Sequence, residues 1–249
     1  MNLEKIAENT IEKAYIIAKN FINDSVVLSS KNKDIKTLAD TEINECIINE
    51  LKKTNIPIIS EEIENQNSNI PNRCWIVDPL DGTLNFSRQF PNSSISIALW
   101  DNSMPKLGFV KNIFDGSLYK SYLNKKTKKN SHFINVSKVS KISNAVLATG
   151  FPSGSSYEFQ NLLSFIENVQ KFKKIRAIGS ASLMLAYVAE GVFDVYYEKD
   201  IYIWDVASGL SLVKEAGGMI FLKKTNEFKY EVLASNKLIF DEAKHLLIK

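Results

Sequence analysis

Two aspartates separated by two residues, Asp78 and Asp81, lie in the stretch Cys-Trp-Ile-Val-Asp-Pro-Leu-Asp-Gly-Thr-Leu-Asn-Phe that spans residues 74–86. Carboxylates held this close repel each other and lose hydration, and a divalent metal between them is the simplest remedy. Gly82 removes the side chain where the backbone must approach a ligand, and Thr83 adds a hydroxyl and a free amide; successive amides in such a turn form a concavity for an anion. The stretch predicts a site for metal and phosphate. An ordinary Asp-Gly surface turn is the alternative.

The elements around this turn indicate how the acids are brought together. The apolar run Trp75–Val77 predicts a buried strand that ends at Asp78. A shorter strand over residues 56–60 delivers Glu61 and Glu62 at its end. Adjacent glutamates are common as solvated surface pairs, but two strands that each end in acids indicate convergence on one ion.

Three motifs in this order closely resemble the inositol monophosphatase family of Mg-dependent, lithium-sensitive phosphatases. They are Glu61-Glu62, Asp78-Pro-Leu-Asp-Gly-Thr83 and Trp204-Asp205-Val-Ala-Ser-Gly209. The resemblance extends from the first helix to the Leu-Ala-Ser-Asn segment at residues 233–236. It is weakest between about residues 120 and 139.

The resemblance implies an α/β fold, a layered αβαβα sandwich of the sugar phosphatase type. We expect one domain over residues 1–249, with an N-terminal α+β half of about 1–140 and a C-terminal α/β half of about 141–249. The family is commonly a homodimer, so a homodimer is expected here.

The resemblance also implies roles for individual residues. One metal would take Glu61, Asp78 and the Leu80 carbonyl, a second would take Asp78, Asp81 and Asp205, and Glu62 would support the cluster. Only hard oxygen donors are present, which favours Mg²⁺, in two or three ions, or Mn²⁺ over zinc. Catalysis would involve Glu61, Thr83 and Asp40, and substrate contacts would come from Asp81, Gly82, Thr83, Gly179, Ser180, Ala181, Glu198 and Asp205.

The resemblance further implies that Asp40 accepts a hydrogen bond from the Thr83 hydroxyl, which would orient that hydroxyl toward the attacking water and help to remove its proton. Each assignment has a simpler alternative. Asp40, Ser180 and Asp205 all stand at predicted helix starts and could be caps. Glu198 follows a predicted strand and could be a plain surface acid.

The periodicity elsewhere predicts alternating helices and strands. Helices are expected over 3–22, from 40 to 51, over 162–169, from 183 and over 204–216, and strands over 94–99, 107–114, 118–123, 145–149, 174–178 and 193–198. Residues 29–36 are predicted to be a loop, which in the resembling family can cover the active site. The lysine-rich residues 124–130 are predicted to be a solvated hairpin end.

Three positions depart from the family pattern. Ser60 stands where glycine precedes the acidic pair, and Ser208 replaces the second alanine of the Trp-Asp motif. No glycine occurs between Gly116 and Gly150, where the family has a glycine-rich turn.

Composition limits the class of protein. The 249 residues are 45% hydrophobic with a net charge of +3, which is too mild by itself to indicate a nucleic-acid binder. Two cysteines, Cys46 and Cys74, read as reduced. With no signal-like start and no long apolar run, we expect a soluble cytoplasmic protein without a membrane partner.

These observations predict a metal-dependent phosphomonoesterase acting on a small sugar or polyol phosphate such as inositol 1-phosphate. Fructose 1,6-bisphosphate or a 3′-phosphoadenosine nucleotide could occupy the same site. A regulatory or RNA-associated interaction protein that retains the fold is the alternative from another class.

Overall fold

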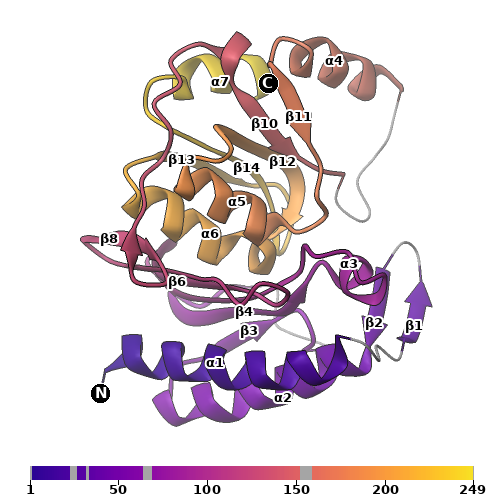
Figure 1. Ribbon diagram of the computed structural model, residues 1–249, viewed down its shortest axis with the longest axis vertical. Coiled ribbons are helices and arrows are strands. Elements are labelled where there is room, and N and C mark those ends of the chain that lie inside the picture. The colour runs from indigo at the N-terminus through magenta and orange to yellow at the C-terminus, as the bar shows by residue number, and fades with distance from the viewer. Residues whose placement is uncertain (1, 23–26, 32–33, 64–68, 152–158, 249) are drawn as a thin grey trace.

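The computed structural model describes residues 2–22, 27–31, 34–63, 69–151 and 159–248, and these form five layers (Figure 1). From the bottom of Figure 1 to the top, the layers are α1 with α2, a seven-stranded sheet, α5 with α6, a five-stranded sheet, and α4 with α7. The αβαβα sandwich expected from the sequence is therefore confirmed.

Each helical layer is a pair of helices, and the short helix α3 lies outside these pairs. Their bounds are α1 Leu3–Phe21, α2 Leu38–Leu51, α3 Thr83–Ser87, α4 Phe159–Val169, α5 Ala181–Glu190, α6 Ile203–Glu215 and α7 Phe240–Leu247, with 3-10 turns at Lys52–Thr54 and Ile142–Asn144. Within the described ranges, no helix combines the length and apolar character needed to cross a membrane.

The larger sheet has the order β3-β4-β5-β6-β7-β8-β9, with β3 parallel to β4 and the rest antiparallel. Its strands are β3 Ile58–Ser60, β4 Arg73–Asp81, β5 Ser94–Asp101, β6 Met104–Asn112, β7 Leu118–Tyr122, β8 Lys125–Lys129 and β9 His132–Phe133. The strands predicted over 94–99, 107–114 and 118–123 correspond to β5, β6 and β7, which form an antiparallel meander with a hairpin between β6 and β7.

The smaller sheet has the order β11-β10-β12-β14-β13, and its central strand is β12. Its strands are β10 Val146–Thr149, β11 Lys174–Arg176, β12 Val195–Tyr202, β13 Met219–Lys224 and β14 Lys229–Ser235. Because β10 runs parallel to both β11 and β12, the carboxyl ends of these three strands lie at one edge of the sheet.

Strand β4 is buried on both faces, as its continuous apolar run predicts. Trp75 and Val77 pack toward α1 and α2, whereas Cys74 and Ile76 pack toward α5 and α6. The prediction that this strand ends at Asp78 was wrong, because pairing with β5 resumes at Asp81 after a register shift. Pro79 lies in that shift, where the missing amide hydrogen costs no ladder bond.

Two predicted loops contain strands. Residues 29–36 include most of β1 (Val27–Lys31) and β2 (Asp34–Thr37), which pair antiparallel, while residues 32 and 33 lie outside the described part. Residues 124–130 contain β8 rather than a free hairpin end. The Thr127 hydroxyl of β8 is buried and donates to the Leu212 carbonyl of α6, which ties this polar strand to the core.

Helix α6 lies unusually close to the larger sheet. Gly108 on β6 leaves no room for a side chain, because a Cβ atom there would overlap the Ser208 carbonyl oxygen and come within 2.9 Å of the Ser211 Cβ. Gly209 has the same effect toward α5, where a Cβ would overlap Leu185. The position of α6 is therefore set by close contact at these two glycines.

Replacing Gly108 with alanine should lower the free energy of unfolding by about 3 kcal/mol, the upper end for overpacking, because a backbone carbonyl must move. Chemical denaturation measures the change. The control is Gly217→Ala: nothing lies within 4 Å there, and φ is +92°, so the cost is about 1 kcal/mol of backbone strain. Equal losses in the two variants would contradict the close packing of α6.

Candidate metal centre

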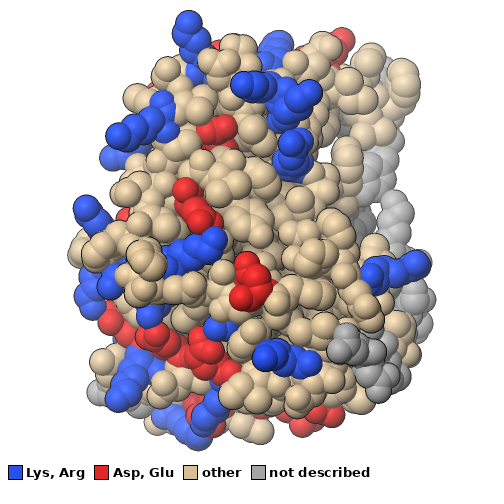
Figure 2. Space-filling model, viewed as in Figure 1, with Lys and Arg blue, Asp and Glu red and all other residues tan. Residues whose placement is uncertain are grey.

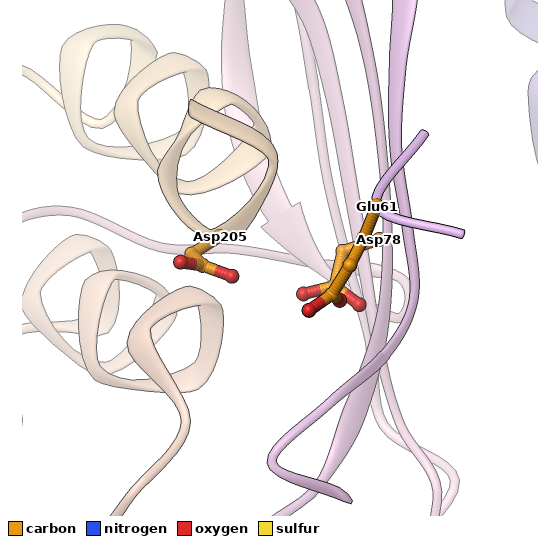
Figure 3. Close-up of side chains that lie close together, drawn as sticks. All are labelled: Glu61, Asp78 and Asp205. Carbon is orange, nitrogen blue, oxygen red and sulfur yellow. The ribbon is translucent and has the colours of Figure 1, made fainter. Parts of the chain in front are cut away.

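Three acids from three separate elements meet between the two sheets. Glu61 follows β3 and donates its amide hydrogen to the Val77 carbonyl of β4 (N···O 3.3 Å), which places it beside Asp78. Asp205 lies in the first turn of α6. One carboxylate oxygen from each of the three acids lies within 4.8 Å of the others, and Figure 3 shows Asp205 facing the other two across the gap.

The electrostatics of this acidic triad call for a cation. Asp78 is fully buried, and burial together with Glu61, Asp81 and Asp205 raises its pKa well above the usual value. Burial, Glu61 and Asp81 do the same to the pKa of Asp205. The Leu80 amide donates to Asp78 Oδ1 (2.9 Å), whereas no donor among the described residues reaches the buried Oδ2. The donor set, all carboxylate oxygens, fits Mg²⁺ or Mn²⁺.

Asp81 lies outside this triad and faces the start of α5. Its carboxylate accepts hydrogen bonds from the Ser180 hydroxyl (2.7 Å), the Ser182 hydroxyl (2.6 Å), the Ser182 amide (2.8 Å) and the Ala181 amide (3.3 Å). Burial raises the pKa of Asp81, and these hydrogen bonds oppose that rise. Asp81 therefore joins the Asp-Gly-Thr turn to the helix that begins at Ala181.

Two glycines allow the Asp-Gly-Thr turn to touch the Gly179 turn. Gly82 has φ of +87°, and a Cβ there would lie 2.9 Å from the Gly179 carbonyl oxygen. Gly179 has φ of +72°. The Asn85 side-chain amide fixes the contact by donating to the Ile178 carbonyl (2.7 Å) and to the Asn92 carbonyl (2.7 Å).

Asp40 is both a helix-start residue and a partner of Thr83. Its Oδ2 accepts from the amide and hydroxyl of Thr37, the N-cap of α2, which makes a capping box. Its Oδ1 lies 3.1 Å from the Thr83 hydroxyl, which is also 3.0 Å from the Leu80 carbonyl oxygen. Burial raises the pKa of Asp40 to about 6, against the lowering effect of the Thr37 hydrogen bonds. Nearby Glu62 forms an ion pair with Lys36 of β2.

Glu198 lies on β12, with its carboxylate against Gly150. A Cβ at Gly150 would lie 2.8 Å from Glu198 Oε1, so only glycine leaves this carboxylate its space. Glu198 is buried rather than a plain surface acid. Burial, with a contribution from Asp81, raises its pKa to about 8.

Several residues of the site have no assigned role in the sequence interpretation. Ser182 and Asn85 make the hydrogen bonds described above, and Ser60, in place of the family glycine, donates its hydroxyl hydrogen to the Asn44 side chain of α2 (2.8 Å). The sequence gives one sign that polar groups line this side of the site, which is the alternation of serine and isoleucine along β5. Ser94 and Ser96 both lie on the face of the sheet toward α5 and α6, where they contact Ser182 and Ser208.

Comparison with known proteins agrees with this architecture of layered sheets and helices around an acidic site. The family model described as the inositol monophosphatase family matches residues 1–246. The chain belongs to this family.

Two similar proteins and one similar crystal structure illustrate how this chain compares with known members of the family. It is 37% identical over 227 residues to the fructose-1,6-bisphosphatase/inositol-1-monophosphatase of Thermotoga maritima, covering 88% of this chain and 84% of that protein. It is 33% identical to the Nus factor SuhB of Pasteurella multocida, covering 86% and 80%. The crystal structure of the extragenic suppressor protein suhB from Bartonella henselae superposes with a TM-score of 0.87 at 28% identity, covering 100% and 99%.

The raised pKa values of Asp78 and Asp205 predict how stability depends on pH. A carboxyl with a raised native pKa holds a proton that the unfolded chain has lost, so stability is highest in acid and falls as pH rises through the native pKa. In EDTA, the parent should therefore lose more stability than Asp78→Asn as pH rises above the ordinary carboxyl range, and Mg²⁺ should restore the lost stability. Thermal unfolding at each pH tests this. Matching pH dependence in parent and variant, with no response to Mg²⁺, would contradict it.

Proposed function

We propose that the protein is a Mg²⁺-dependent phosphomonoesterase that hydrolyses a small sugar or polyol phosphate such as inositol 1-phosphate. The observation that carries this proposal is the acidic triad of Glu61, Asp78 and Asp205, in which a fully buried carboxylate oxygen of Asp78 lacks a hydrogen-bond donor within the described structure. Membership of a phosphatase family supports the reaction class.

The residues divide the binding of two metals between them. Glu61, Asp78 and the Leu80 carbonyl would hold one ion, and Asp78 and Asp205, with Asp81, would hold the second. Asp81 would reach that ion while keeping part of its hydrogen bonding to α5. When bound, paired divalent ions bind phosphate oxygens, acidify a water molecule and neutralise the leaving oxygen.

Thr83 and Asp40 move the proton of the attacking water. If the Thr83 hydroxyl donates to Asp40, its own oxygen is free to accept a proton from water. The buried Asp40 carboxylate is a stronger base than a solvated aspartate, since its pKa is raised to about 6. Hydrolysis therefore needs no covalent phosphoenzyme.

The opposite side of the site suits the alcohol part of the substrate. Glu198 lies on β12 just beyond the last residue that pairs with β10, against Gly150, and it can accept from vicinal hydroxyls or donate to them when protonated. The remaining wall of the substrate site would be backbone, from Gly82 and Thr83 on one side and Gly179, Ser180 and Ala181 on the other. A polyol phosphate therefore fits with its phosphate toward the triad and its hydroxyls toward Glu198.

Within the class of small phosphate esters, we also propose an order of preferred substrates. Inositol 1-phosphate is our first choice, and the dual name of the Thermotoga relative makes fructose 1,6-bisphosphate the first alternative. A 3′-phosphoadenosine nucleotide is the second. Inhibition by lithium belongs to the same proposal.

Relatives named Nus factor SuhB raise a second kind of role, in an RNA-associated complex. The lysine-rich strand β8 would be the obvious surface, yet Lys125 pairs with Glu4 and Lys129 pairs with Glu190. Both signs of charge are interspersed on the face shown in Figure 2. These pairings favour the enzymatic function.

A homodimer is part of the proposal, supported by apolar side chains exposed on the outer layer. Phe159, Leu163 and Ile166 of α4 are 46–77% exposed at helical spacing. Light scattering should give twice the 28.1 kDa mass of the chain. A monomer at micromolar concentration would overturn this part and leave the enzymatic proposal standing.

The enzymatic proposal predicts that Asp78→Asn abolishes phosphate release from inositol 1-phosphate in Mg²⁺, by at least about a thousandfold, because both metals lose a ligand. The matched control is Glu231→Gln, which changes a buried carboxylate on β14 that accepts from Tyr197. The control should retain activity. A parent that is folded but inactive on all three substrates would overturn the proposed function.

A further inference from the structure

Helices α5 and α6 contact the larger sheet through pairs of buried hydroxyls. Ser94 of β5 lies 2.6 Å from Ser182 of α5, and Ser96 lies 2.6 Å from Ser208 of α6, oxygen to oxygen. All four residues are buried. With the backbone of α6 this close to β6, side chains as short as serine reach from one layer to the other.

These serines are aligned with the acids of the site. In the antiparallel pairing of β4 with β5, Ser96 lies opposite Asp78 and Ser94 lies opposite Asp81. Cross-strand partners share a face of the sheet, so each serine points to the same side as its acid. Ser208 follows Asp205 by one turn of α6, on the same side of the helix. The Ser96–Ser208 contact therefore spans the same gap as Asp78 and Asp205.

The first pair has a fixed direction. Ser182 donates its single hydroxyl hydrogen to Asp81 (2.6 Å), so its oxygen must accept from Ser94. A chain of two hydrogen bonds thus runs from β5 through α5 to an acid of the neighbouring strand. The second pair, Ser96 with Ser208, ends at the first turn of α6, where the Trp204 carbonyl is 3.4 Å from the Ser96 hydroxyl.

We propose that Ser96 and Ser208 are positioning residues that set the separation between Asp78 and Asp205, and thereby the affinity of the site for its divalent metal. The inference rests on the proposed metal-dependent function. Serine at position 208 is one of the departures of this chain from its family motif, and its hydroxyl contacts the Ser96 hydroxyl of β5. Groups that orient metal ligands typically change affinity by about 10–100-fold when removed.

The structure supplies a matched control on the same helix. Ser211 makes an equivalent buried contact with Ser121 of β7 (2.8 Å), one turn farther from Asp205. Removing either hydroxyl costs one buried hydrogen bond between α6 and the sheet, so Ser208→Ala and Ser211→Ala should lose similar amounts of thermal stability. Only the first loses a contact aligned with the acids.

The test is a titration of the metal-free protein with Mn²⁺, in which electron paramagnetic resonance measures the free ion and gives the dissociation constant. Ser208→Ala should bind Mn²⁺ about tenfold more weakly than the parent, and Ser211→Ala should change by less than about twofold, as expected for a distant site. Ser96→Ala should weaken binding at least as much as Ser208→Ala, because it also removes the longer contact with the Trp204 carbonyl, and the double variant should match Ser96→Ala, because the hydrogen bond between the two serines is lost only once.

Two results would overturn the inference while leaving the proposed function intact: Ser208→Ala and Ser96→Ala both binding Mn²⁺ as tightly as the parent, or Ser211→Ala losing as much affinity as they do. Failure of the parent itself to bind Mn²⁺ would overturn the metal centre and this inference together. Steady-state assays give a second readout, in which Ser208→Ala needs more Mg²⁺ for half-maximal rate and recovers the parental maximum at saturation.

Discussion

Mutual repulsion among Glu61, Asp78 and Asp205 is the constraint around which this structure is built. Their carboxylate oxygens lie within 4.8 Å of one another, and Asp78 is shielded completely from water. Without a cation such a cluster is unfavourable, because ionised groups lose both hydration and distance from like charges. The packing of the surrounding layers must hold the acids in place against that repulsion.

The layers provide that rigidity by close contact rather than by large side chains. Helix α6 reaches β6 at Gly108 and α5 at Gly209, positions where a Cβ would overlap the neighbouring element. Asp205 is carried by this helix and Asp78 by a strand buried on both faces, so neither can move without displacing a packed layer. Serine hydroxyls satisfy each other in the narrow space that remains.

Sequence reasoning identified the acids and their order because the chemistry is local to short motifs. A strand that reaches Asp78 and a second that ends just before Glu61 follow directly from apolar runs bounded by acids, and the layered fold followed from the family resemblance. The register shift between Asp78 and Asp81 could not be read in this way, since a proline in a strand signals interruption, and only pairing with Ser94 shows that the strand resumes. The orientation of Asp81 toward α5 depends on Ser180 and Ser182, residues about a hundred positions away.

Strand β8 was missed because its lysines resemble a solvated tip, whereas one buried threonine and two ion pairs hold it in the sheet.

The most direct measurement is anomalous scattering from crystals grown with Mn²⁺. We expect a peak between the carboxylates of Glu61, Asp78 and Asp205, at about 2.0–2.3 Å from oxygen atoms of these side chains, as is usual for a hard divalent ion. Crystals without such a peak at saturating Mn²⁺, or with Glu61 and Asp205 turned away from Asp78, would contradict it.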